Sequence, residues 1–262
     1  MNKTVGMMVV VILLFGAAIG WYVMQETDAP EIQPEQAVKP SSAPVAPAMS
    51  QPVQESAAAP LPQLKDSDPV IGEAISNLFG ADTFEKYFRP EKLVRNIVVT
   101  IDNLPRKTVS LRLFPVKPVG GKFRTQGDEE NLEISPANAA RYKAYVGIFE
   151  TIDAEKLVAV YSRFSPLFQR AYQELGYPTG SFNDRLITVI DHLLDAPEIK
   201  GPLRLVQPNV MYLYEDPGLE SKSSGHKILM RVGLENEARI KSKLRQIRRE
   251  LASQFSKQLS KG

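Results

Sequence analysis

Residues 181–198, SFNDRLITVIDHLLDAPE, contain one of the two histidines of the chain and three aspartates. Carboxylates and an imidazole on one helix could bind a divalent cation or exchange protons with a substrate. A zinc site normally takes three or four ligands, and His192 is the only nitrogen ligand in this stretch. A carboxylate-only magnesium site stays open, although such sites usually rely on substrate phosphates. The second histidine, His226, lies in a separate segment that the sequence does not place beside the first.

The same stretch also has the pattern of an ordinary amphipathic helix. At 100° per residue its apolar side chains share one face, whereas Asp184, Asp191 and Asp195 lie opposite, with His192 beside them. Ser181 followed by Asp184 resembles a capping box, and Pro197 ends the helix. The apolar face consists of Phe182, Leu186, Ile187, Val189, Ile190, Leu193 and Leu194. We therefore predict a helix with a solvated or partner-paired polar strip, and no metal site.

A second chemical pattern is Ser224-Gly-His-Lys227, which has the S-x-x-K spacing of penicillin-recognising serine enzymes. The chain contains none of the companion motifs S-D-N and K-T-G, and no G-x-S-x-G elbow. We assign no catalytic residue and predict that the protein is not an enzyme. An envelope hydrolase that uses carboxylates or Ser224 is the alternative function.

The C-terminal helix carries the densest charge in the sequence. Its apolar residues Ile240, Leu244, Ile247, Leu251 and Phe255 form a narrow stripe flanked by cations. The cations are Arg239, Lys241, Lys243, Arg245, Arg248 and Arg249. A surface helix packed on its own domain explains this pattern, with the long cationic side chains covering apolar surface. The alternative is a partner-binding face, made of Arg239, Lys241, Arg245, Arg248 and Arg249, for an anionic lipid, polymer or protein.

Residues 5–24 read VGMMVVVILLFGAAIGWYVM and contain no formal charge. Twenty residues at a rise of about 1.5 Å span about 30 Å, the thickness of a hydrocarbon core. We predict an uncleaved transmembrane helix rather than a cleaved signal peptide, because the apolar run exceeds a typical signal core. Lys3 lies on one side and no Lys or Arg follows before Lys39, which places residues 1–4 in the cytoplasm. Gly16 and Gly20 form a G-x-x-x-G pattern that could support a weak homodimer.

Residues 25–63 are rich in proline and alanine and contain no aromatic residue. Such a segment cannot bury enough apolar surface to fold, so we predict a disordered tether. The tether leads to a folded domain over residues 64–262, outside the cytoplasm and, in a bacterium, on the periplasmic side of the inner membrane. The formal net charge of +2 does not favour nucleic-acid binding. Because there is no cysteine, disulfides, thiol nucleophiles and cysteine zinc sites are excluded, and we predict no cofactor.

The folded domain is predicted to be mostly helical. Helices are expected at 68–79, 81–88, 91–104, 135–150, 154–176, 181–195, 219–232 and 235–258. Asp68 and Ser135 are the expected N-caps of their helices, each followed by proline. For residues 91–104 a strand is the alternative to a helix. In the helix expected at 154–176, Pro166 predicts a break or kink. Between residues 105 and 135 we expect an irregular or β-hairpin excursion around Gly120-Gly121, and VMYLY at 210–214 indicates a short strand.

Several runs resemble a bacterial family called domain of unknown function 3014. The runs are LKDSDP (64–69), TIDNLPR (100–106), RYKAYV (141–146), SPLFQRAYQELGYPTGSFNDRLITVIDHLLDAPE (165–198), YEDPGLE (214–220) and HKILMRVGLENEARIKSKLRQIR (226–248). The resemblance extends from Leu64 to Ala252 and implies an envelope protein with an N-terminal anchor and a Pro/Ala-rich tether. It carries no assigned activity or catalytic residue. The sequence therefore predicts a membrane-anchored periplasmic interaction or scaffolding module whose partner is an envelope protein or an anionic surface.

Overall fold

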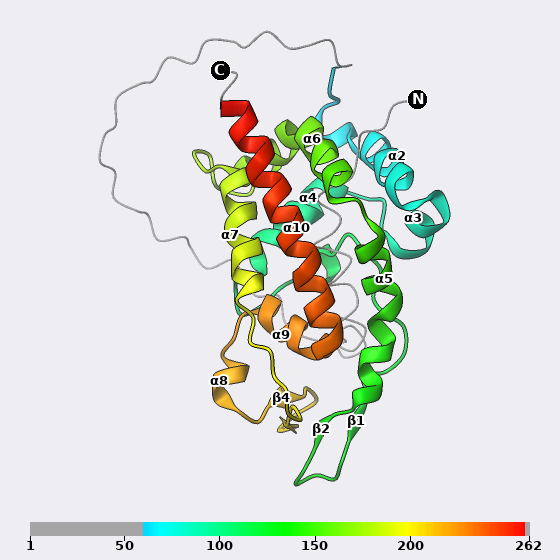
Figure 1. Ribbon diagram of the computed structural model, residues 1–262, viewed down its shortest axis with the longest axis vertical. Helices are drawn as coiled ribbons and strands as arrows, with labels where there is room; N and C mark the ends of the chain where they lie inside the picture. The colour runs from blue at the N-terminus through cyan, green and yellow to red at the C-terminus, as the bar shows by residue number, and fades with distance from the viewer. Residues whose placement is uncertain (1–59, 260–262) are drawn as a thin grey trace, which may run out of the picture.

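The computed structural model describes the backbone of residues 60–259 and the side chains of residues 60–256 (Figure 1). This part is mostly helical, as predicted. The helices are η2 (Leu64–Asp66), α2 (Asp68–Phe79), α3 (Ala81–Tyr87), α4 (Leu93–Asn103), η3 (Leu111–Leu113), η4 (Pro136–Tyr142), α5 (Lys143–Thr151), α6 (Ala154–Glu174), α7 (Phe182–Leu194), α8 (Pro217–Glu220), α9 (Ser224–Val232) and α10 (Leu234–Leu259). The strands are β1 (Thr125–Gln126), β2 (Glu133–Ile134), β3 (Leu205–Val206) and β4 (Leu213–Tyr214). The predicted transmembrane helix, its G-x-x-x-G pattern and most of the tether lie outside the described residues.

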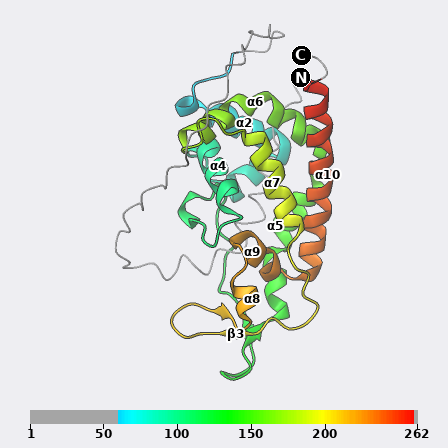
Figure 2. The same cartoon turned by 90° about the vertical axis from the view of Figure 1, so that its left-hand side faces the viewer.

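One hydrophobic core joins the long helices. Helix α10 runs along the helical body above the β hairpins and packs against α5, α6, α7 and α9 (Figures 1 and 2). The predicted stripe of α10 is buried at Ile240, Leu244, Ile247 and Leu251, and Phe255 is partly buried. Five aromatic residues fill the space between the helices with almost no exposed surface, namely Tyr142, Phe149, Tyr161, Phe164 and Phe182. Burial of this apolar surface is the main favourable term that fixes the helices.

Two short antiparallel hairpins form a β lobe at the end of the molecule opposite to residue 60 and the C-terminal end of α10 (Figures 1 and 2). The hairpins are joined because the Ile134 N–H donates to Leu203 O and the Leu205 N–H donates to Leu132 O. A small separate cluster of Leu205, Tyr214 and Met230 forms the core of the lobe. Since Met230 belongs to α9, this helix connects the lobe to the body.

The first hairpin forms within the excursion that the sequence predicted, but its turn is not at Gly120-Gly121. The turn lies at residues 127–132, where Gly127 has φ 92° and a Cβ would stand 2.1 Å from Asn131 O. Asp128 Oδ1 accepts the backbone N–H of Asn131 at 2.9 Å and stabilises the turn. Gly121 O is instead bound by Arg141 at 2.7 Å, so its loop is fixed against η4.

Pro166 does not break helix α6, which is continuous from Ala154 to Glu174. Proline removes the N–H that would bind the carbonyl of residue 162. The Ser165 hydroxyl donates to Ser162 O at 2.9 Å and satisfies that carbonyl. The predicted break is therefore wrong, and a neighbouring side chain replaces the lost backbone hydrogen bond; the alternative, a kink, stays a prediction.

Other helix ends also differ from the predictions. Asp68 does not cap its own helix; its carboxylate accepts the Lys92 and Leu93 N–H groups at 2.6 and 2.8 Å and so caps α4. The helix expected after Ser135 begins as the 3₁₀ helix η4, and Ser135 makes no side-chain cap. The helix expected over 219–232 is two helices, because Ser223 starts a new one by accepting the His226 N–H at 3.2 Å.

Candidate functional site

Helix α7 confirms the wheel drawn from the sequence. Phe182, Leu186, Val189, Ile190 and Leu193 are buried, and the Ser181 hydroxyl accepts the Asp184 N–H at 3.3 Å as the predicted cap. The three aspartates do not converge on a common point. Asp191 accepts two hydrogen bonds from Arg248 of α10 at 2.7 and 2.9 Å, whereas Asp184 and Asp195 are exposed. Within residues 60–259, no group of three or more His, Asp or Glu side chains is arranged to hold a metal ion.

The two histidines meet where α7 ends and α9 begins. Their rings stack with centroids 4.0 Å apart and an angle of 9° between the planes. His226 Nε2 lies 2.6 Å from His192 O, and His192 Nε2 lies 2.7 Å from the Ser223 hydroxyl. Partial burial lowers the pKa of His192 below its ordinary value, His226 acts in the same direction, and Asp195 opposes the shift. We call His192, Ser223 and His226 the histidine clasp.

A second polar cluster surrounds Asp102 at the end of α4. The carboxylate is almost fully buried and accepts hydrogen bonds from Arg106, Arg185 and the Tyr177 hydroxyl at 2.7, 2.8 and 3.1 Å. Arg185 also donates to Asp102 O, and Arg106 donates to the Tyr177 hydroxyl. This Asp102 hub ties α4 to α7 and to the loop that precedes α7. Every partner lies within the domain, so the hub has a structural role.

Neither serine at the start of α9 is arranged for nucleophilic attack. Ser224 is buried, and Lys227 Nζ binds Glu220 at 2.7 Å rather than the Ser224 hydroxyl. Ser223 contacts an imidazole, but its oxygen also accepts the His226 N–H as the helix cap. The neighbouring Ser224 and Gly225 N–H groups donate to Arg106 O and Leu104 O. They are therefore not free to stabilise an oxyanion, which acyl transfer at this serine would require.

The cations proposed as a partner-binding face of α10 are divided between the interior and the surface. Arg239 pairs with Glu150, and Arg248 pairs with Asp191. Lys241 is buried and contacts Ala196 O at 2.6 Å and the carboxylates of Glu198 and Glu237 at 3.0 Å each. Arg245 and Arg249 remain exposed. Binding of an anionic partner by this helix stays a prediction, and two arginines are available for it.

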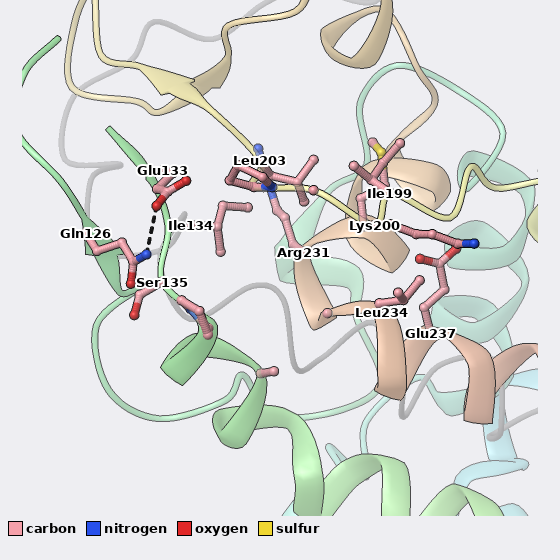
Figure 3. Close-up of a pocket in the computed structure, with 16 residues that line it drawn as sticks. Gln126, Glu133, Ile134, Ser135, Ile199, Lys200, Leu203, Arg231, Leu234 and Glu237 are labelled. Carbon is pink, nitrogen blue, oxygen red and sulfur yellow. Dashed lines mark hydrogen bonds between the residues drawn. The ribbon is translucent and has the colours of Figure 1, made fainter. Parts of the chain in front are cut away.

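A cleft of about 400 Å³ opens where the β lobe meets the body. Its walls come from four places, namely Gln126 of β1, strand β2 with the start of η4, the irregular segment 199–203, and the junction of α9 and α10 (Figure 3). The apolar lining consists of Ile134, Pro136, Ala139, Ile199, Pro202, Leu203, Met230 and Leu234. Leu234, which belongs to this lining, keeps 39% of its surface exposed. The cleft therefore offers an uncovered apolar wall.

Charged groups stand at both ends of the cleft (Figure 3). Glu133 accepts a hydrogen bond from Gln126 at 2.8 Å at one end, and Lys200 and Glu237 lie at the other. Burial raises the pKa of Glu237, and the ion pair with Lys241 opposes the shift. The Arg231 guanidinium carbon lies 5.4 Å from the centre of the Tyr214 ring, which holds the cation beside the apolar wall. The cleft thus combines apolar surface with fixed charges, a combination typical of ligand sites.

The family model for DUF3014, described as a protein of unknown function, matches residues 93–248, more than half of the chain. The chain belongs to the DUF3014 family. The DUF3014 match contains the Asp102 hub, the histidine clasp and all residues that line the cleft. It confirms the predicted resemblance over residues 93–248. No curated protein and no solved structure matches the chain.

Only part of the Asp102 hub, the histidine clasp and the cleft could be predicted from the sequence of this DUF3014 protein. Its resemblance runs include Asp102, Arg185 and His226, but nothing in one sequence states which side chains meet. The cleft was missed because its walls come from four segments between residues 126 and 237. In the sequence, nothing distinguishes Leu234, an apolar residue directly after Gly233, from a buried residue.

Proposed function

We propose that this DUF3014 protein is a membrane-anchored interaction module of the bacterial envelope that holds a partner in the cleft. The observation that carries the proposal is the uncovered apolar wall beside Lys200 and Arg231. Apolar surface next to a few placed polar groups is suited to binding. Among the described residues that line the cleft, no nucleophile is paired with a base, so we favour binding over catalysis.

The lining indicates a ligand that is apolar and carries an acidic group. Lys200 and Arg231 contribute positive charge, and the N-terminal end of α10 adds partial positive charge. Lys241 pairs with both Glu198 and Glu237, so this end of the cleft keeps some negative charge, and Glu133 adds an opposing charge at the far end. Gly201 leaves open space, since a Cβ there would meet no atom within 4 Å. We infer that an extended peptide segment of an envelope partner, with apolar residues and one carboxylate, fits this cleft.

The anchor and the location belong to the same proposal. The uncharged run 5–24 and the position of Lys3 support one pass through the inner membrane with the folded domain in the periplasm. In the part that the structure describes, no helix is both long and apolar enough to cross a bilayer. A reporter that is active only in the periplasm, fused after Gly262, should be active. Recovery of soluble protein that begins near residue 20 would contradict the anchor.

Site-specific photocrosslinking in cells tests the binding site. A photoreactive residue at Leu234 should yield discrete crosslinks to an envelope protein, and the charge change Arg231→Glu should abolish them. The matched control is Ala238, which is exposed one turn further along the same helix and does not line the cleft. Crosslinks of equal yield at both positions, or none at Leu234, would rule out the cleft as the binding site.

No observation favours the alternative of an envelope hydrolase. Ser224 is buried and has no base, and Asp184, Asp191 and Asp195 do not share a site. A secondary contact of Arg245 and Arg249 with an anionic surface, and weak dimerisation through Gly16 and Gly20, remain proposals that are separate from the cleft.

A further inference from the structure

The second hairpin of the β lobe, formed by β3 and β4, has apolar side chains on both of its faces. Leu205 and Tyr214 face the core of the lobe and are buried. The strand register pairs Val206 with Leu213, so these two side chains share the outer face, where they are 39% and 36% exposed. A hairpin with one solvated face normally carries polar side chains there. The outer face of this hairpin is therefore an uncovered apolar surface.

The connection between the two strands extends this surface. Val210 lies in the connection and is 54% exposed. Residues 205–214, LVQPNVMYLY, contain no charged side chain. Six large hydrophobic side chains stand exposed among the described residues, and three of them, Val206, Val210 and Leu213, belong to this hairpin. We call these three side chains the apolar tip.

The apolar tip is carried on a projection. Figure 2 shows the β3–β4 hairpin extending sideways from the molecule, away from α10, whereas the β1–β2 hairpin points along the long axis. The turn of the β1–β2 hairpin contains three consecutive acids, Asp128, Glu129 and Glu130, which are therefore directed elsewhere. The apolar tip is thus presented to a surface outside the folded domain.

Aromatic and cationic side chains stand behind the tip. The Tyr212 ring of the hairpin packs against the Phe123 ring, with the ring centres 6.0 Å apart. Phe123 is flanked by Lys122 and Arg124, whose side chains are exposed and make no ion pair within the described residues. Aromatic rings favour the interfacial layer of a bilayer, and cations favour its anionic headgroups. The sequence of apolar tip, aromatic pair and cations therefore matches the layers of a lipid surface.

The charge of the neighbouring chain agrees with this match. Between Asp102 and Asp128 the sequence contains six lysines or arginines and no carboxylate. At the base of the hairpin, Arg204 and Glu215 approach each other to 3.9 Å and offset each other. The surface behind the tip is therefore positive, which complements an anionic bilayer.

The small size of the tip argues against a second copy of the chain as its cover. A stable protein interface buries about 800 Å² on each partner. Three aliphatic side chains that are already about half covered provide only a small part of such an area. A lipid surface requires less, because a tethered domain meets its own membrane at a high effective concentration. A few apolar side chains then suffice for a weak, reversible contact.

We propose that the apolar tip inserts into the periplasmic leaflet of the inner membrane, with Lys122 and Arg124 at the headgroups. Residues 25–59 are rich in proline and reach up to about 110 Å at about 3.1 Å per residue, far enough for the hairpin to meet the bilayer. The choice of membrane and the effective concentration rest on the proposed anchor, whereas the affinity of the tip for lipid does not. Because the contact is weak, a domain that is pulled away stays attached through the anchor alone.

Fluorescence quenching on the full-length protein tests the insertion. The chain has no cysteine, so Asn209→Cys creates a single labelling site beside the tip and leaves its three side chains intact. The labelled protein is reconstituted into vesicles of phosphatidylethanolamine and phosphatidylglycerol. A quencher attached to the lipid acyl chains should quench this label several-fold more than an aqueous quencher. The matched control, Glu129→Cys in the turn of the other hairpin, should show the reverse. Dominant aqueous quenching at both positions would overturn the proposal.

Removal of the tip separates insertion from mere proximity to the bilayer. With Val206, Val210 and Leu213 all changed to serine, the lipid-attached quencher should lose most of its effect on the label at 209. The melting temperature should change little, because the three side chains are already exposed. Leu175→Ser, at a leucine that is 38% exposed at the end of α6, should leave the quenching intact. Unchanged quenching in the triple variant would also overturn the proposal.

Charge reversal tests the headgroup contact. Lys122→Glu together with Arg124→Glu should reduce the lipid-attached quenching in vesicles that contain phosphatidylglycerol. In vesicles of phosphatidylcholine alone, which carry no net charge, the same variant should differ little from the wild type. Equal quenching of the wild type and this variant in both kinds of vesicle would remove the two cations from the proposal.

Flotation of the same vesicles distinguishes this inference from the proposed anchor. If the wild type and the triple serine variant float equally but only the wild type is quenched from the lipid, both proposals are supported. If both float and neither is quenched from the lipid, the anchor stands and the insertion is overturned. Flotation of the wild type alone would support the tip and contradict the anchor, and flotation of neither would overturn both. A label shielded from both quenchers would show that protein covers the tip, which also overturns the lipid contact.

Discussion

The Asp102 hub and the cleft each gather charged side chains from distant parts of the chain, but they do so differently. In the hub, one buried carboxylate accepts bonds from Arg106, Arg185 and Tyr177, and their hydrogen-bonding groups face one another. In the cleft, Lys200, Arg231 and Glu133 stand around about 400 Å³ of accessible space beside exposed Leu234. The hub is closed within the domain, whereas the proposal of a binding site in the cleft rests on charge beside uncovered apolar surface.

The largest effect that would sharpen this comparison is expected in the hub. Asp102→Ala removes the shared acceptor and leaves Arg185 and Tyr177 without it, which should lower the free energy of unfolding by about 3–5 kcal/mol. Denaturant titration measures the change, and Asp102→Asn, which keeps the shape, should lose less. A loss below about 1 kcal/mol, the value of an exposed ion pair, would remove the structural role of the hub.

A large loss is also expected for Leu193→Ala, whose side chain is fully buried between α7 and the start of α9. Truncation of a buried leucine leaves a cavity and typically costs about 2–5 kcal/mol. A Cβ at Gly225 would stand 2.6 Å from Leu193 Cδ2. The double variant Leu193→Ala with Gly225→Ala should therefore be more stable than the sum of the two single changes implies. Strict additivity would show that these residues do not share the space.

Stability should depend on pH through His192 of the clasp. The pKa of His192 is lower in the folded state than the ordinary value of 6.5, so the unfolded chain binds more protons between those two values. The free energy of unfolding should therefore fall as the pH drops from about 7 to about 5, and His192→Gln should remove this part of the slope. Thermal unfolding at several pH values checks the sign. A slope in the opposite direction would mean that the folded state binds the proton more tightly.

The smallest effects are expected at the surface aspartates of α7 and at the cleft wall. Asp191→Asn weakens the pair with Arg248 and should cost more stability than Asp195→Asn, which loses no hydrogen bond to another element.

Leu234→Ser should leave the melting temperature nearly unchanged, because the side chain is already 39% exposed, yet reduce crosslinking in the cleft. A melting temperature that falls as far as in Leu193→Ala would show that Leu234 belongs to the core.

The sequence predicted those parts of the fold that depend on local spacing. The apolar face of α7, its Ser181 cap and the end of α2 at Gly80 follow from side chains a few residues apart. The burial of Lys241 could not be foreseen, because α10 is contacted by α5, α6, α7 and α9, and its buried arc is wider than its apolar stripe. A helical wheel assigns such a lysine to solvent, although the Ala196 carbonyl and two carboxylates compensate its desolvation.

The candidate site was less predictable than the fold, for a physical reason. His192 and His226 are brought together by the packing of α7 against α9, and Ser223 caps a helix whose start the sequence did not separate from α8. The cleft has no local pattern, since β2, the segment 199–203 and α10 contribute only a few residues each. Contacts of this kind depend on the tertiary arrangement and cannot be obtained from periodicity.

The 26-residue helix α10 connects the two ends of the domain on which a pulling force would act. At a rise of about 1.5 Å per residue it is about 39 Å long, and it runs from the cleft to the end of the molecule where residue 60 lies (Figure 1). Under the proposed anchoring, tension between a bound partner and the membrane is directed along this helix. The force then acts parallel to the packed faces of α5, α6 and α7, so many side-chain contacts share the load in shear.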